Sequence, residues 1–126
     1  MTGHDPTGIF GTSTALHDIL VLAGPETAPR LLQQIHADLV AVASLLLPAL
    51  PPPHDWPQIR RQTHVLISLA GTIGAMRLHG LAIEMNTAAH DQDCSRAAAL
   101  LPPLEADLTG LIALVGLRLP GHGVVA

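Results

Sequence analysis

The sequence predicts an all-α protein, folded as an antiparallel up-and-down four-helix bundle with a short extra N-terminal helix. Two observations predict this fold class. Ala and Leu are the commonest of the 126 residues, and the only aromatic residues are one Phe and one Trp, a composition that favours helices over strands. Apolar residues also recur at helical spacing in five segments, which Pro, Gly or Asp residues separate. The length fits a single domain.

The first two predicted helices are divided by Gly24-Pro25, which stops the first of them. That helix is short and begins behind Ser13 as its N-cap. The second begins at about Ala28, behind Thr27, and ends where Pro48 and three further prolines follow. Their apolar faces are Leu16, Ile19, Leu20 and Ala23 in the first helix, and Leu31, Ile35, Leu39, Val42 and Leu46 in the second.

Asp55 is the predicted N-cap of the third helix, and Pro57 is tolerated in its first turn because the N–H that proline lacks has no helical partner there. Gly74 closes this helix in a left-handed conformation. The fourth helix follows from about Ala75 and ends at the turn Asp91-Gln92-Asp93. The buried stripes are Trp56, Ile59, Thr63, Leu66, Ala70 and Ile73 in the third helix, and Leu78, Leu81, Ala82, Met85 and Ala89 in the fourth.

The fifth predicted helix, from Ser95 to about Leu117, contains Pro102-Pro103. Two prolines remove two N–H donors and crowd the preceding turn, so we expect a sharp kink or a break there. Around the bundle of residues 13–118 we expect a flexible N-terminal segment, residues 1–12, and a frayed C-terminal tail, residues 119–126. The apolar side of the fifth helix is Ala98, Leu101, Leu104, Leu108, Leu111, Ile112 and Val115.

Composition argues against several classes of partner. The net charge is -4 and all six basic residues are Arg, so the basic stripe with interleaved aromatics that is typical of nucleic-acid binding is missing. The longest apolar runs, around 39–50 and 108–117, are shorter than the ~20 residues of a bilayer span. The N-terminal stretch lacks the pattern of a secretory signal. We therefore expect neither a nucleic-acid partner nor a membrane partner.

The thiol and imidazole side chains do not predict a metal centre. Cys94 is the single cysteine, which excludes an internal disulfide and favours a reducing, cytoplasmic setting. The eight histidines form no His-x-x-x-His pair, and no cluster of Cys or carboxylate residues accompanies them, so we expect no metal. The oligomeric state stays open.

His64 lies on the outer face of the third predicted helix, opposite its buried stripe. Near neutral pH an imidazole nitrogen is a nucleophile that can accept a phosphoryl group. Two guanidinium groups one turn earlier would attract phosphate oxygens, and small residues one and two turns later leave room for another protein to approach. The residues three, four and seven positions away that share its face are Arg60, Arg61, Ile67, Ser68 and Gly71.

The residues around His64 resemble the histidine phosphotransfer (Hpt) domain family. The family's signature is a histidine, two spacer residues, Lys, Gly and small residues, with Gly-Ala ten and eleven positions after the histidine. The likeness spans about residues 16–115, and its specific part is 55–84. Ile67 and Ser68 stand where the family has the Lys and the Gly. The matching residues are His64, Leu66, Ala70, Gly71, Ile73, Gly74 and Ala75, followed by Leu78, Leu81, Ala82 and Glu84.

The resemblance implies a phosphoryl carrier rather than a stand-alone turnover enzyme. His64 would accept a phosphoryl group from the aspartate of one response-regulator receiver domain and pass it to another, with a (hybrid) histidine kinase as a further partner. The Mg²⁺ ion would belong to the receiver domain, so the chain would need no cofactor of its own. Ile67 removes a cation beside the phosphate and places an apolar group at the rim of the docking surface.

Two alternative functions come from other classes. One is a degenerate Hpt-like bundle that binds a receiver domain or histidine kinase as an adaptor or inhibitor, without being phosphorylated. The other is a helical dimerisation module, in which Ile67 and Leu69 form an exposed apolar patch.

Overall fold

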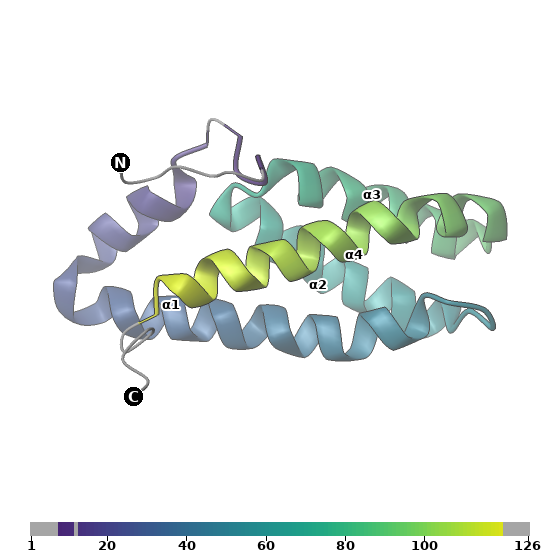
Figure 1. The fold of residues 1–126 in the computed structure, drawn as a ribbon, viewed down its shortest axis with the longest axis horizontal. Coiled ribbons are helices and arrows are strands. Elements are labelled where there is room, and N and C mark those ends of the chain that lie inside the picture. Colours follow the sequence, from purple (N-terminus) through teal and green to yellow (C-terminus); the bar gives the residue numbers. More distant parts are fainter. Residues whose placement is uncertain (1–7, 12, 120–126) are drawn as a thin grey trace.

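The computed structural model describes residues 8–11 and 13–119, which form four helices and no strand. The helices lie side by side along the length of the molecule (Figure 1). Two of them, α1 and α3, each pack against both α2 and α4. The predicted all-α bundle is confirmed. The helices are α1 (Ala15–Ala49), α2 (Trp56–Ile73), α3 (Met76–Asp91) and α4 (Cys94–Leu117).

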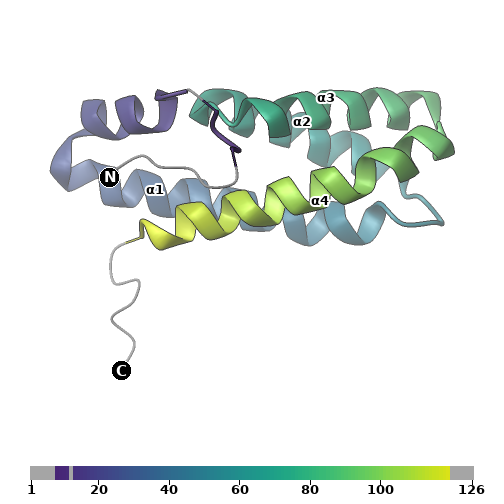
Figure 2. The ribbon, with the colours of Figure 1, turned by 45° about the horizontal axis from the view of Figure 1, so that its top comes forward.

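Helix α1 is kinked at Gly24, whose φ of 85° and ψ of 165° are not helical. The predicted stop at Gly24-Pro25 therefore occurs, but as a kink within one element, and the residues before it turn away from the rest of α1 (Figures 1 and 2). The predicted restart behind Thr27 is wrong, because helical geometry resumes at Pro25. A proline suits the first helical position, since its φ is already set and its missing N–H has no partner to lose.

Capping residues set the start of α2, the end of α2 and the start of α4. The Asp55 carboxylate accepts a hydrogen bond from the backbone N–H of Gln58 at 3.2 Å, and Gly74 ends α2 with a left-handed φ of 79°. Both predictions are confirmed. The Asp93 carboxylate caps α4 by accepting from the N–H of Arg96 at 3.0 Å, so α4 begins at Cys94, one residue before the predicted start.

Helix α4 runs without interruption through Pro102-Pro103, so a break at these prolines, one of the two predicted outcomes, does not occur. Both prolines are exposed, as are Ala98 and Ala99, the residues four positions earlier whose carbonyls lose their helical donors. Water can bind those carbonyls, and the proline rings meet no neighbouring helix. The first turns of α4 also face differently from the prediction: Ala97 and Leu100 are buried instead of Ala98.

The core lies between the four helices and is almost entirely aliphatic. Ile9, within the segment predicted to be flexible, is only 1% exposed and belongs to this core, so that prediction needs correction at this position. Leu119, at the start of the predicted tail, also packs against the core. Residues 1–7 and 12 of the predicted N-terminal segment, and residues 120–126 of the predicted tail, lie outside the described residues. The core residues with no exposed surface include Leu39, Leu46, Ile59, Leu66, Leu78, Met85, Leu104, Leu108 and Leu111.

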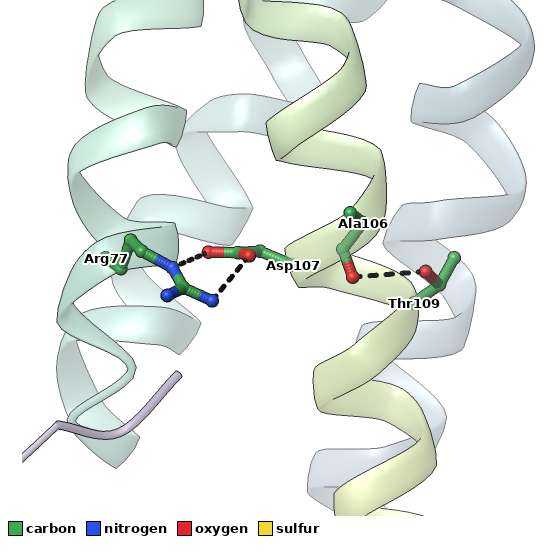
Figure 3. Close-up of polar contacts among 4 residues, drawn as sticks. All are labelled: Arg77, Ala106, Asp107 and Thr109. Atoms are coloured by element: carbon green, nitrogen blue, oxygen red, sulfur yellow. Dashed lines mark hydrogen bonds and ion pairs between the residues drawn. The ribbon is translucent and has the colours of Figure 1, made fainter. Parts of the chain in front are cut away.

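A charged side chain is buried between α3 and α4. Asp107 is 7% exposed, and its two carboxylate oxygens accept hydrogen bonds from Nε and Nη2 of Arg77 at 2.6 and 2.8 Å (Figure 3). On the same helix, Thr109 Oγ1 donates to the carbonyl of Ala106 at 3.2 Å. A bidentate guanidinium contact compensates much of the cost of burying a carboxylate. The ion pair therefore links α3, which carries Arg77, to α4, which carries Asp107.

Within residues 8–11 and 13–119, two helices are long and apolar enough to cross a membrane by length and composition alone. They are α1, with a mean hydropathy of 1.4 over 18 consecutive residues, and α4, with 1.5. The uninterrupted apolar runs around 39–50 and 108–117 are shorter than these helices, each of which extends beyond its run. Both helices also contribute core residues to the bundle, and core helices satisfy the same criterion.

Candidate functional site

His64 is exposed on the outer face of α2, while the neighbouring Thr63 and Leu66 are fully buried. The imidazole borders a shallow depression of about 540 Å³ between α2 and α3. Its lining from α2 consists of Arg60, Arg61, Gln62, His64 and Val65, and its lining from α3 consists of Asn86 and His90. The structure thus brings three of the predicted site residues together: His64, Arg60 and Arg61.

The depression favours an anion. None of the described residues that line it is acidic, and two of them are arginines. Neither Arg60 nor Arg61 forms an ion pair with any part of the chain that the structure describes. Their guanidinium groups are therefore available to an anion at this face, which they can bind as charged hydrogen-bond donors. His90 adds ring nitrogens from the opposite helix.

A polar contact between α3 and α2 precedes His64 in the sequence. Asn86 Nδ2 donates to Thr63 Oγ1 at 2.9 Å and to the carbonyl of Arg60 at 3.3 Å. Thr63 Oγ1 in turn donates to the carbonyl of Ile59 at 2.7 Å. Since Thr63 has no exposed surface, these bonds satisfy a buried hydroxyl and tie the turn before His64 to α3.

A second polar contact between the same two helices follows His64. His79 Nδ1, on α3, lies 3.0 Å from the carbonyl oxygen of Ile67. A carbonyl oxygen can only accept, so this geometry requires the proton on Nδ1. The ring lies against Gly71, where a Cβ atom would come within 3.1 Å of His79 Nδ1. His64 is thus placed between two points at which α3 holds α2.

The remaining predicted site residues do not line the depression. Ser68 is exposed, and Gly71 is half-buried beneath the His79 ring. Ile67 and Leu69 are half-buried and pack against the core, so the exposed apolar patch that a dimerisation module would need is not formed by these two residues. Both extend the buried stripe of α2 instead.

Sequence reasoning missed the contribution of α3 to this site. His79, Asn86 and His90 are spaced seven and four residues apart, so they follow one another along one side of α3. That spacing was visible in the sequence, but only the packing of the two helices shows that this side borders α2. Within the described ranges, no group of three or more His, Cys, Asp or Glu side chains is arranged to hold a metal ion.

The structure thus has an exposed histidine beside two arginines, in a depression that is more open than the pockets that usually enclose small ligands. In the comparison with protein families, the model of the Hpt domain matches residues 26–115. The chain therefore belongs to the Hpt domain family, whose members are phosphotransfer modules of phosphorelays and interact with receiver domains and histidine kinases. Searches of curated proteins and of solved structures give no match.

Proposed function

We propose that the protein is a phosphorelay carrier in which His64 accepts a phosphoryl group from the aspartate of one receiver domain and transfers it to that of another. The observation that carries this proposal is the exposed imidazole of His64 beside Arg60 and Arg61, within the region that matches the Hpt family. His90 lines the same depression from α3, but His64 is the histidine that stands at the position of the family's phosphorylated histidine.

The proposed reaction is an in-line displacement at phosphorus. A lone pair of the His64 ring attacks the phosphorus atom of the aspartyl phosphate, the N–P bond forms as the P–O bond to the carboxylate breaks, and the aspartate leaves as a carboxylate. Transfer to the second receiver domain reverses these bond changes. The Mg²⁺ ion that neutralises the phosphoryl oxygens belongs to the receiver domain in this proposal, so the chain itself needs no cofactor.

The side chains around His64 support both steps. Arg60 and Arg61 attract the incoming aspartyl phosphate and then contact the phosphoryl oxygens, although their solvation limits the effect to about 1 kcal/mol or less per charge. Val65, next to His64, and Ile83, on α3, are each 43% exposed. A receiver domain can pack against these apolar side chains. Ser68 is small and exposed, so it leaves space for the receiver domain to approach His64.

The proposal takes the fold as an antiparallel up-and-down bundle, with residues 15–23 as the short extra N-terminal helix. The connections in Figure 1, each of which turns the chain back along the bundle, support this topology. It also takes the protein to be cytoplasmic, with receiver domains and a (hybrid) histidine kinase as partners and no nucleic-acid or membrane partner. The single thiol, Cys94, is exposed and suits a reducing compartment.

One observation favours the adaptor alternative. Ile67 replaces the family's lysine one turn after His64, and its side chain packs against the core, so no cation projects from that position. In that alternative, the chain binds a receiver domain or kinase through the same surface while His64 stays unphosphorylated.

Labelling with a small phosphodonor separates the two functions without knowledge of the partner. The purified protein is incubated with phosphoramidate, which donates phosphoryl groups to imidazoles, and the label is located by peptide mass spectrometry at alkaline pH. We expect one phosphohistidine, at His64, which is lost in His64→Gln and kept in the matched variant His17→Gln, since His17 is also exposed but lies on α1. A folded wild-type protein without label at His64 would favour the adaptor.

A further inference from the structure

The contact between His79 and Ile67 assigns a role to a histidine outside the depression. Building on the proposed function, we propose that His79 is a positioning residue: its imidazole fastens the turn of α2 that follows His64 to α3, and position 71 is a glycine so that this ring can reach the α2 backbone.

The distances make a side chain at position 71 a tight fit. A Cβ atom there would lie 3.1 Å from Nδ1 and 3.2 Å from Cε1 of His79, closer than ordinary van der Waals contact. The Nδ1 atom lies 3.0 Å from the Ile67 carbonyl oxygen. A Cβ atom at position 71 would therefore require the ring to shift by a few tenths of an ångström from its place beside that oxygen. Gly71 therefore serves the contact between helices rather than the approach of a partner.

The Ile67 carbonyl can accept this additional bond. Inside a helix it already accepts the N–H of the residue four positions later, Gly71, but a carbonyl oxygen has two lone pairs and binds a second donor. The His79 ring is half-buried, so water competes less well for this oxygen than it does at the exposed face of α2. The bond thus fixes a defined point of the α2 backbone relative to α3.

The location of that point gives the bond its consequence for phosphoryl transfer. Asn86 holds α2 at Arg60 and Thr63, before His64, and His79 holds it at Ile67, three residues after. Without the second contact, the apolar packing of α2 on α3 remains, but the side-chain hydrogen bonds that α3 makes to α2 near His64 lie only on its N-terminal side. In-line transfer between two docked proteins depends steeply on the position of the nucleophile, and a displacement of about 1 Å can slow such a step roughly a hundredfold.

Variants at position 79 test the proposal through chemistry as well as size. His79→Leu keeps the bulk but removes the donor, whereas His79→Asn places an amide N–H near the position of Nδ1. We expect His79→Leu to slow transfer from a phosphorylated receiver domain to His64 roughly tenfold, and His79→Asn to retain most of the wild-type rate. Labelling of His64 by phosphoramidate, which needs no docked orientation, should change much less in both variants.

A double-mutant cycle with Gly71→Ala tests the steric part of the same claim. Gly71→Ala should slow receiver transfer in the wild-type background, but have no further effect in the His79→Ala background, where the ring is absent. Any one of three results would overturn the positioning role. The first is an equal transfer rate for His79→Leu and wild type, and the second is equally slow transfer for His79→Asn and His79→Leu. The third is additive effects of the two Ala substitutions. A wild-type protein that takes no label from either donor would instead overturn the proposed function.

Discussion

Removing the Arg77 side chain should destabilise the bundle more than removing the side chain of Arg96, which also forms an ion pair but on the surface of the molecule. Arg77→Ala leaves the Asp107 carboxylate, whose side chain is 9% exposed, without the guanidinium that contacts both of its oxygens. Breaking a fully buried ion pair costs about 3–5 kcal/mol, and an exposed pair about 0–1 kcal/mol. Because the Arg77 side chain is itself 50% exposed, we expect an intermediate loss of about 2 kcal/mol.

Urea unfolding measures this loss, with a matched control on the same molecule. Arg96 and Glu84 also form an ion pair, but their side chains are 52% and 46% exposed, so Arg96→Ala should lower the free energy of unfolding by less than about 1 kcal/mol. Replacing both members of the buried pair, as Arg77→Met with Asp107→Leu, should recover part of the loss since no charge is then left unpaired. Equal losses for Arg77→Ala and Arg96→Ala would refute this reasoning.

The other predictions concern the surface around His64. Replacing Arg60 and Arg61 together by Ala should slow phosphoryl uptake from a receiver domain at low salt, with a difference that shrinks as salt is added; a difference that does not depend on salt would exclude an electrostatic role. Ile67→Lys should weaken receiver binding, measured by calorimetry, and speed labelling by phosphoramidate if a cation at this position aids the chemistry. Because Ile67 is half-buried against the core, this variant should also lose about 1 kcal/mol of stability, and an unchanged urea midpoint would show that its packing contributes nothing.

Local features of the site were predictable from the sequence because they depend on a single helix. His64, Arg60 and Arg61 share a face through the three- and four-residue spacing of α2, and the start at Asp55 and the stop at Gly74 follow from residues that cap helices. Such features are fixed by the chain within a few residues of each other. They needed no knowledge of how the helices pack.

Features that depend on the packing of two helices were not predictable in the same way. One side of α3 borders α2, and this packing brings Asn86, His90 and His79 to the site. The burial of Asp107 is explained by its ion pair with Arg77, which lies on α3. The absence of a break at Pro102-Pro103 also depends on surroundings that the sequence does not show. Whether a proline inside a helix causes a break depends on what surrounds the carbonyls it leaves without donors, and in α4 that surrounding is solvent.

Reconstitution of the relay tests the central claim most directly. A receiver domain carrying a radiolabelled aspartyl phosphate is mixed with the protein and a second, unlabelled receiver domain in the presence of Mg²⁺, and the label on each chain is followed over time. The account predicts that label passes through a base-stable, acid-labile phosphohistidine on His64 to the second receiver domain, and that His64→Gln stops this passage while the protein stays folded. Passage of label through the His64→Gln variant, or binding of a receiver domain to the wild-type protein with no label at His64, would contradict it.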